Sequence, residues 1–298
     1  MFDFLQKQGT AIELSTLVVE LADAIKKISE NIVKTSSGKV GTHNSFGEEQ
    51  AALDLRAEEI IQEHLKVCPP VRAFASEELD ELAELNENGK FIVAYDPLDG
   101  SSLIDVNFAM GTIVGIYGTN ELLGRTGRDQ VAAIYAIYGP RTLLVFSTGK
   151  GAHEFTLVNG VWELTAENLK LEGGKNKYFA PGNLRAAKER EDYLELVNSF
   201  IKEGYTLRYS GGMVPDIHHS FVKGHGIFMY PGSPAAPQGK LRLLFECAPM
   251  AFIAEQAGGA ASNGKVDILD IRIESIHQQS PILIGTKEEV QRAALALN

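Results

Sequence analysis

The feature that most constrains the fold is a short apolar run, residues 91–95, that ends abruptly in acidic residues. The segment FIVAYDPLDGSS places Asp96 and Asp99 three positions apart, with Pro97 between them and Gly-Ser-Ser behind. An apolar run of this length, bounded by turn residues, is typical of a buried strand. Two carboxylates in one turn repel each other, so a strand that ends this way needs a neutralising partner.

Two further apolar runs are also interrupted by acids. Glu77 and Glu78 follow a strand-like run, and Glu246 stands alone in the apolar segment KLRLLFECAP, which also carries Lys240 and Arg242. A helix start would explain Glu77 and Glu78 equally well, because the helix dipole favours negative charge in the first turn. Buried charges are tolerated when they are paired or bound to a metal. Three interrupted runs together therefore favour a shared cation site.

The DPLDGSS turn has the chemistry of a metal and phosphate site. Mg²⁺ prefers oxygen ligands, with one or two carboxylates for each ion. Asp96 and Asp99 can face one cavity, and the stiffening by Pro97 lets Leu98 offer its carbonyl. The Gly-Ser-Ser that follows supplies backbone N–H groups and hydroxyls suited to a phosphate. Solvated turns use the same residue types, so the argument depends on all three acidic segments.

The composition is that of a globular protein with one large α/β domain or two smaller ones. The chain has 298 residues, of which 44% are hydrophobic and 22% charged, as is usual for soluble domains. Its formal net charge of −11 argues against a nucleic-acid partner. Metal ions would supply the positive charge that an anionic substrate needs. The two cysteines, Cys68 and Cys247, lie far apart, which favours a reducing compartment.

The sequence gives no sign of a membrane or secretory segment. No apolar stretch approaches the ~18 residues needed to cross a bilayer, and the N-terminus has no signal-peptide pattern. We therefore expect a cytoplasmic protein without a membrane partner. A plastid origin with the transit peptide removed stays open as an alternative.

Helical spacing and β-like runs predict two α/β halves, residues 1–172 and 173–298. Successive β runs punctuated by glycine in the first half predict a mostly antiparallel sheet. The stretch 35–47 is rich in Gly, Ser and Asn, which predicts a mobile loop. The expected helices, from apolar periodicity, cover residues 14–33, about 48–65, 191–203 and 216–223.

These motifs resemble one known family. The segments FASEE, AYDPLDGSSLIDVNFAMGTIVGIYG and KLRLLFECAPMAFIAEQAGG are similar to those of the fructose-1,6-bisphosphatase and sedoheptulose-1,7-bisphosphatase family, over residues 10–284. GRTGRDQVAAIYAIYGPRT, FAPGNLRA and YTLRYSGGMVPD look closest to the sedoheptulose branch. The related inositol monophosphatases usually carry a Trp-Asp motif, but the single tryptophan here, Trp162, precedes a glutamate.

The resemblance implies a layered α/β fold of the sugar-phosphatase type, with stacked α-β-α-β-α layers and mixed, largely antiparallel sheets. It also implies a role for each matching residue. The expected metal ligands are Glu77, Asp96, the Leu98 carbonyl, Asp99 and Glu246, with Glu48 near a third ion. Glu78 and Asp54 match the acidic pair that activates the attacking water.

The substrate contacts are implied in the same way. Gly100, Ser101, Ser102 and Arg242 match contacts to the phosphate that is cleaved. Lys240, Gly211, Gly212 and Met213 would surround the sugar. Asn183, Arg208, Tyr209 and Tyr230 match a clamp on the distal phosphate.

The implied activity is Mg²⁺-dependent hydrolysis of the 1-phosphate of a sugar bisphosphate, with two or three ions in the site and Mn²⁺ as a substitute. We expect sedoheptulose 1,7-bisphosphate as the substrate, because Arg185 and Ala186 stand where fructose-bisphosphatases carry glycine and tyrosine. The smaller Ala186 would make room for a longer sugar, and Arg185 would restore charge. Fructose 1,6-bisphosphate, or both sugars, is the close alternative, and a catalytically silent metabolite-binding protein the remote one. The family also implies a homodimer or homotetramer, in which Arg208 reaches the distal phosphate of a neighbouring subunit.

Overall fold

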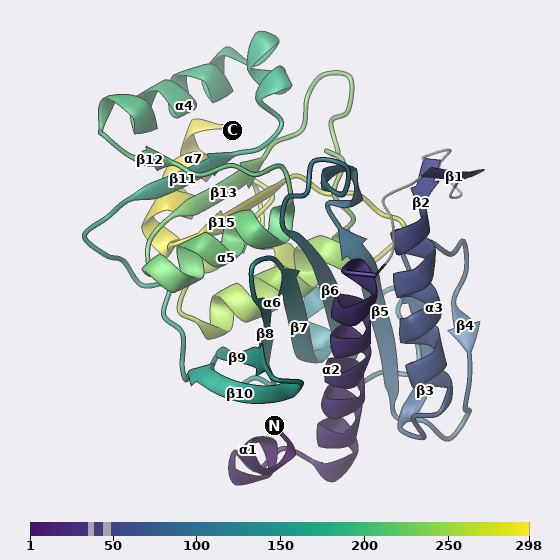
Figure 1. Cartoon of the computed structure of the whole chain (residues 1–298). Coiled ribbons are helices and arrows are strands. Elements are labelled where there is room, and N and C mark those ends of the chain that lie inside the picture. The colour runs from purple at the N-terminus through teal and green to yellow at the C-terminus, as the bar shows by residue number, and fades with distance from the viewer. Residues whose placement is uncertain (35–38, 44–48, 298) are drawn as a thin grey trace.

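Two large β-sheets, one small two-stranded ladder and three layers of helices build the molecule, which is known from a computed structural model describing residues 1–34, 39–43 and 49–297 (Figure 1). The first layer holds α2 (Ile12–Ile32) and α3 (Ala52–Lys66), with the short α1 (Phe2–Lys7) beside it. Helix α2 covers the first sheet because its apolar residues recur at helical spacing, as predicted. No helix in the described ranges is long and apolar enough to cross a membrane.

The first sheet has eight strands in the order β10-β9-β8-β7-β6-β5-β3-β4. Only β3 and β5 run parallel, and every other neighbouring pair is antiparallel. The sheet therefore is mixed and largely antiparallel, as predicted. The strands are β3 (Val71–Ser76), β4 (Ala83–Glu84), β5 (Phe91–Asp99), β6 (Met110–Tyr117), β7 (Gln130–Tyr138), β8 (Thr142–Ser147), β9 (His153–Val158) and β10 (Val161–Ala166).

The second sheet has five strands in the order β12-β11-β13-β15-β14. Strand β11 pairs in parallel with β12 and β13, and the remaining pairs are antiparallel. These strands are β11 (Tyr178–Pro181), β12 (Thr206–Leu207), β13 (Ile227–Tyr230), β14 (Ala260–Ser262) and β15 (Ile282–Gly285).

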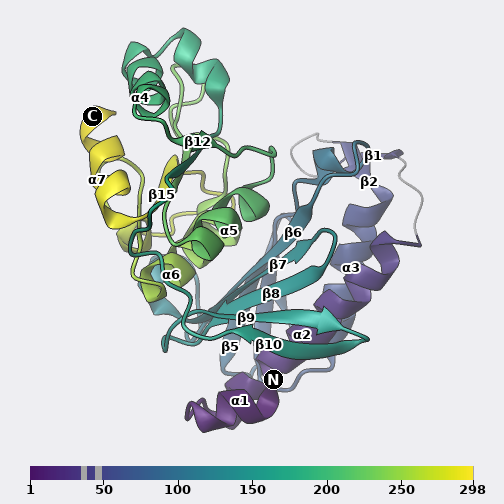
Figure 2. The same cartoon turned by 60° about the vertical axis from the view of Figure 1, so that its left-hand side comes forward.

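Helices α5 (Met213–Lys223) and α6 (Ala248–Gln256) lie between the two sheets, and both contact strands of each (Figure 2). The outermost layer holds α4 (Glu191–Lys202) and α7 (Lys287–Ala296), beyond the second sheet. The five layers thus follow the predicted α-β-α-β-α order. The boundary between halves at residues 172 and 173 stays a prediction, because α5 and α6 pack against the first sheet.

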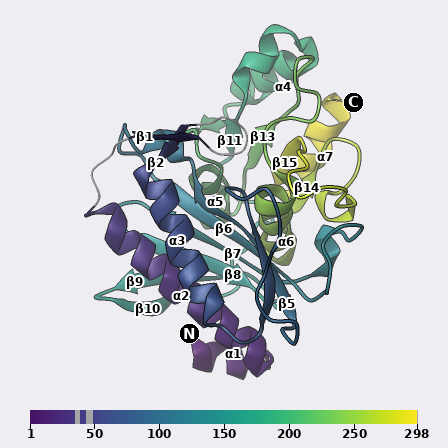
Figure 3. The same cartoon turned by 90° about the vertical axis from the view of Figure 1, so that its right-hand side faces the viewer.

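Strand β5 is buried along its whole length between two layers of helices (Figure 3). Its side chains alternate between faces. Val93 and Tyr95 join the apolar cluster under α2 and α3, whereas Ile92 and Ala94 join the one under α5 and α6. The same alternation points Asp96 toward the central layer of helices.

The structure differs from the prediction around residues 35–51. Lys39–His43 (β1) and Glu49–Ala51 (β2) form a small antiparallel ladder within or beside the expected loop. Helix α3 consequently begins at Ala52, later than expected. Glu48, the predicted acid near a third metal ion, lies outside the described residues.

Candidate active site

A cavity of about 430 Å³ opens where β3 and β5 end, beside the start of α5. Because β3 and β5 run parallel, their carboxyl ends meet at one edge of the sheet, and both strands deliver their acids there. The predicted residues that line the cavity are Asp54, Glu77, Glu78, Asp96, Leu98, Asp99, Gly100, Ser101, Ser102, Tyr209, Gly211, Met213, Tyr230, Lys240 and Glu246.

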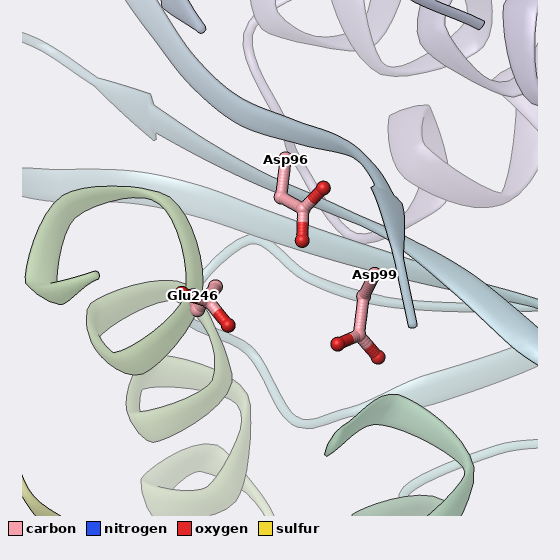
Figure 4. Close-up of side chains that lie close together, drawn as sticks. All are labelled: Asp96, Asp99 and Glu246. Carbon is pink, nitrogen blue, oxygen red and sulfur yellow. The ribbon is translucent and has the colours of Figure 1, made fainter. Parts of the chain in front are cut away.

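Three buried carboxyl groups form the centre of the site (Figure 4). Asp96, Asp99 and Glu246 each present one oxygen, and these oxygens all lie within 4.8 Å of one another. Asp96 and Asp99 come from the end of β5, and Glu246 comes from the π-helical turn η4 (Leu243–Cys247) that leads into α6. Residues about 150 positions apart in the chain thus share one small space.

Burial and mutual repulsion raise the pKa values of these carboxyl groups. The pKa of Asp96 is raised well above its usual value, first by burial and then by the charges of Glu77, Asp99 and Glu246. Burial and Glu77 likewise raise the pKa of Glu246. Burial raises the pKa of Asp99 as well, partly offset by backbone hydrogen bonds and by Lys240. The raised pKa values mean that the charged carboxylates are unstable together unless a positive charge lies between them. Because carboxylate oxygens are hard ligands, the group fits a divalent cation such as Mg²⁺.

Backbone N–H groups hold the three carboxylates in place. The Leu98 N–H donates to Asp96 at 2.9 Å. The Val214 and Met213 N–H groups, at the start of α5, donate to the two oxygens of Asp99 at 2.8 and 3.4 Å. The Arg242 N–H donates to Glu246. The dipole of α5 adds to this support, because a helix N-terminus favours negative charge.

A second group of acids lies beside this cluster. The Glu77 N–H donates to the Tyr95 carbonyl at 3.0 Å, which fixes the chain as it leaves β3. The Glu78 N–H donates to the Ser76 hydroxyl at 3.2 Å. Asp54 is buried in the first turn of α3 and lines the same cavity. The cavity thus brings together all the predicted acids that the structure describes.

The turn after β5 is built to leave backbone groups exposed to the cavity. Gly100 has φ +82°, a left-handed conformation that suits glycine, and the 3₁₀ turn η1 (Ser101–Leu103) follows it. Gly212 packs on the other side of Gly100, since a Cβ on Gly100 would lie 3.5 Å from the Gly212 Cα. Gly212 therefore supports the turn and is not itself among the lining residues.

The cavity wall also carries two aromatic residues and one cation, Tyr209, Tyr230 and Lys240. Burial raises the pKa of the Tyr209 hydroxyl, while the Asn183 backbone and the charge of Arg185 lower it. Asn183 also donates through its side chain to the Pro231 carbonyl at 2.9 Å. Asn183 and Arg185 thus stand behind Tyr209 rather than on the cavity wall.

Two predicted arginines do not line the cavity. Arg242 is buried and donates to the Lys240 carbonyl at 2.8 Å. Arg208 is exposed, donates to the Leu207 carbonyl and lies over the Tyr178 ring.

Sequence reasoning missed four residues that the structure places on the wall. Ile104 and Asp105 follow the Gly-Ser-Ser turn after one intervening residue, Leu103, so their closeness to that turn in the sequence was a usable signal. Phe228 and Leu241 also line the cavity. They lie in apolar runs, and nothing in those runs separates a wall residue from a core residue.

Comparison with known proteins agrees with this geometry. Models of the fructose-1-6-bisphosphatase N-terminal and C-terminal domains match residues 4–167 and 173–298. A class 1 fructose-1,6-bisphosphatase of Geotalea uraniireducens is 48% identical over 97% of this chain and 92% of its own length. A chloroplastic sedoheptulose-1,7-bisphosphatase of Spinacia oleracea is 42% identical over 97% of this chain and 76% of its own length.

A solved structure from Toxoplasma gondii, provisionally named a sedoheptulose-1,7 bisphosphatase, superimposes with a TM-score of 0.94. It is 36% identical, and the match covers 100% of this chain and 98% of the other. The chain is therefore a phosphoric monoester hydrolase with the predicted layered fold. It belongs to the fructose-1,6-bisphosphatase family, whose members depend on metal ions.

Proposed function

We propose that this enzyme hydrolyses the 1-phosphate of fructose 1,6-bisphosphate, with Mg²⁺ as its metal ion and Mn²⁺ as a substitute. The observation that carries the proposal is the cluster of Asp96, Asp99 and Glu246 beside the Gly-Ser-Ser turn, in a cavity whose wall also bears Lys240 and two tyrosines. The names of the relatives favour the six-carbon sugar over the seven-carbon sugar that the sequence analysis placed first. The expected preference for sedoheptulose 1,7-bisphosphate thus becomes the second candidate.

The acidic residues would hold the metal ions. Asp96, Asp99 and Glu246 would ligate directly, with Glu77 and the Leu98 carbonyl beside them and Glu48 as the proposed acid near a third ion. When bound, divalent cations would stabilise the charge that builds up on phosphate oxygens and lower the pKa of a bound water.

The remaining residues would bind the substrate and move its protons. Glu78, supported by Asp54, would take the proton from the attacking water as a general base. The N–H groups and hydroxyls of Ser101 and Ser102 would bind the phosphate that is cleaved, which stabilises the charge on its oxygens in the transition state. Lys240 would bind the sugar and offset the negative charge of the phosphate groups on it.

The distal phosphate would be bound by Tyr209 and Tyr230, with Asn183 and Arg185 behind them. Gly211 and Met213 would contact the sugar, and Arg242 would support the site through the Lys240 carbonyl. Arg208 is exposed outside the cavity, which supports a role in the site of a neighbouring subunit. We therefore propose a homodimer or homotetramer in which each Arg208 completes a partner's distal-phosphate site. A monomer that keeps full activity at low nanomolar concentration would contradict this arrangement.

The second candidate, sedoheptulose 1,7-bisphosphate, depends on Arg185 and on the similarity to relatives of the sedoheptulose branch. Ala186 was expected to leave room for the longer sugar, but its side chain is buried in the apolar cluster with Tyr193 and Phe200. Because that space is filled by neighbouring core residues, the small side chain does not widen the cavity. Arg185 remains close to Tyr209 and could add charge for a phosphate held farther away. The 42% identity to the spinach enzyme keeps this candidate in view.

One experiment separates these possibilities. Phosphate release is measured from both bisphosphates, with Mg²⁺ and with a chelator, and kcat/KM is compared. We expect metal-dependent release and a higher kcat/KM for fructose 1,6-bisphosphate. A higher value for sedoheptulose 1,7-bisphosphate would reverse the choice of substrate, and no release from either would leave a catalytically silent protein.

A further inference from the structure

Glu58, a buried residue that the proposed chemistry does not use, lies directly behind the acidic site. It is 6% exposed and projects from α3, one turn after Asp54. Its Oε2 accepts a hydrogen bond from the Ser76 hydroxyl at 2.6 Å. Its Oε1 accepts from the Tyr95 hydroxyl at 2.9 Å and from the Gln62 amide at 2.7 Å. Both oxygens are therefore engaged with donors from three elements of the fold.

Two of the partners of Glu58, Ser76 and Tyr95, are the last residues before the acids. Ser76 and Tyr95 face each other across the parallel pair β3–β5, and the next residues along the chain are Glu77 and Asp96. The same Ser76 hydroxyl also accepts the N–H of Glu78. One carboxyl group thus connects the helix that carries Asp54 to both strand ends that carry the other acids.

This arrangement is unusual for a residue that only fills the core. Burial raises the pKa of Glu58, while hydrogen bonds from Ser76, Gln62 and Tyr95 lower it. A buried carboxyl group costs stability unless donors compensate it, and an apolar side chain of similar size would avoid that cost. Leucine would fill the same space at a smaller cost in stability. Leucine could not, however, accept hydrogen bonds from Ser76 and Tyr95 and so hold them together.

We propose that Glu58 is a positioning residue that fixes Glu77, Glu78 and Asp96 relative to Asp54, and with them the geometry of the metal and water sites. The expected effect on catalysis rests on the proposed function. The expected effect on the positions of the acidic side chains does not. Glu58 touches neither substrate nor reacting atoms. Its removal should therefore affect kcat and metal binding more than KM for the sugar.

The test compares Glu58→Leu with a matched control, Glu289→Leu. Glu289 is also a buried glutamate, on α7 in the outermost layer, and it accepts hydrogen bonds from the Tyr205 hydroxyl and from His225. Each substitution removes one buried carboxyl group and leaves one tyrosine hydroxyl without its acceptor. The measurements are Tm, Mn²⁺ affinity by electron paramagnetic resonance, and kcat and KM for fructose 1,6-bisphosphate.

We expect Glu58→Leu to lower kcat by about 10²-fold, because a shift of ~1 Å in a catalytic group costs that much. Mn²⁺ affinity should fall by about tenfold, within the range for residues that orient metal ligands, with KM nearly unchanged. Glu58→Gln, which keeps one acceptor, should recover part of both losses. Glu289→Leu should lose stability but keep kcat and Mn²⁺ affinity.

Unchanged kcat and Mn²⁺ affinity in Glu58→Leu would overturn the inference, as would equal kinetic losses in Glu289→Leu at a matched loss of Tm. If Glu58→Leu does not fold, Tyr95→Phe decides, because it removes one donor with little change in shape. It should weaken Mn²⁺ binding, and unchanged binding would also count against the proposal. Because Mn²⁺ binding needs no substrate, it tests the inference even if wild-type protein releases no phosphate, in which case only the proposed function fails.

Discussion

Asp96→Asn should inactivate the enzyme and at the same time stabilise the metal-free protein. Asp96 is the residue for which we expect this combination of effects, because burial and the charges of Glu77, Asp99 and Glu246 all raise its pKa. Its Oδ1 accepts a backbone hydrogen bond from the Leu98 N–H. Asparagine can keep that bond through its carbonyl oxygen, so the substitution removes the charge and little else.

The size of the effect follows from the distances. Two unit charges 4.8 Å apart, the largest separation in the cluster, repel by about 3.5 kcal/mol at an effective dielectric constant of ~20. Asp96 has two partners in the cluster, so the repulsion between three fully charged groups would cost it at least about 7 kcal/mol. The buried carboxyl groups of the metal-free protein avoid most of this repulsion by binding protons, so we expect a gain of about 1–3 kcal/mol at neutral pH. At roughly 2–4 °C per kcal/mol, Tm should rise by several degrees.

The stability gained by Asp96→Asn should depend on pH. The pKa of Asp96 is raised in the folded protein, so the folded state holds protons that the unfolded state releases above about pH 4. The metal-free wild type therefore loses stability as pH rises from that value through the folded pKa. The Tm difference between Asp96→Asn and wild type should be small near pH 4 and increase toward neutral pH.

The assay is thermal unfolding of chelator-treated protein across this pH range, with and without Mg²⁺. Added Mg²⁺ should raise the Tm of wild type much more than that of the variant. The kcat/KM of the variant should fall by more than about 10²-fold, because replacing a residue that only orients a metal ligand already costs up to about that much. Asp105→Asn, at an exposed position on the same cavity wall, is the control and should change neither Tm nor its metal response. A metal-free Asp96→Asn protein that is folded but no more stable than wild type at neutral pH would refute the electrostatic reasoning.

Three further predictions concern the rest of the site. Glu78→Gln should lower kcat by about 10²–10⁴-fold with little change in the Mg²⁺ concentration for half-maximal activity; a collapse of metal affinity would make Glu78 a ligand instead. Asp216→Asn should raise KM for the bisphosphate more than it lowers kcat, because Asp216 accepts the N–H groups of Ser210 and Gly211 and so holds the Tyr209 loop; steady-state kinetics with both parameters resolved checks this. Arg185→Ala should lower kcat/KM for sedoheptulose 1,7-bisphosphate more than for fructose 1,6-bisphosphate, and equal losses would exclude Arg185 from selectivity.

The acidic site could be predicted from the sequence because its signals are local. An apolar run that ends in DPLDG marks a buried strand and its turn, and the side chains beyond it must share the edge of the sheet. The same logic applied to Glu77 and Glu78, since β3 lies parallel to β5. Long helices such as α2 were equally predictable, because apolar periodicity over many residues has few alternative explanations.

What could not be predicted depends on contacts between distant segments. Nothing in its own segment shows that Glu58 meets Ser76 and Tyr95, because that contact exists only once α3 packs on the sheet. The small strand pair β1–β2 was missed because glycine and polar residues dominate its sequence. The burial of Ala186 could not be predicted for a related reason, since it arises in the apolar cluster that includes Tyr193 and Phe200 of α4, and the role of this position in substrate selectivity stays a prediction.

The central claim is that a buried carboxylate cluster makes this protein a metal-dependent sugar-bisphosphate phosphatase. The most direct test is the rate of phosphate release from fructose 1,6-bisphosphate by chelator-treated protein, followed during titration with Mg²⁺. The structure predicts no release without metal and full recovery on addition of Mg²⁺, with no recovery in Asp96→Asn. Release at an undiminished rate in the presence of chelator would contradict the account.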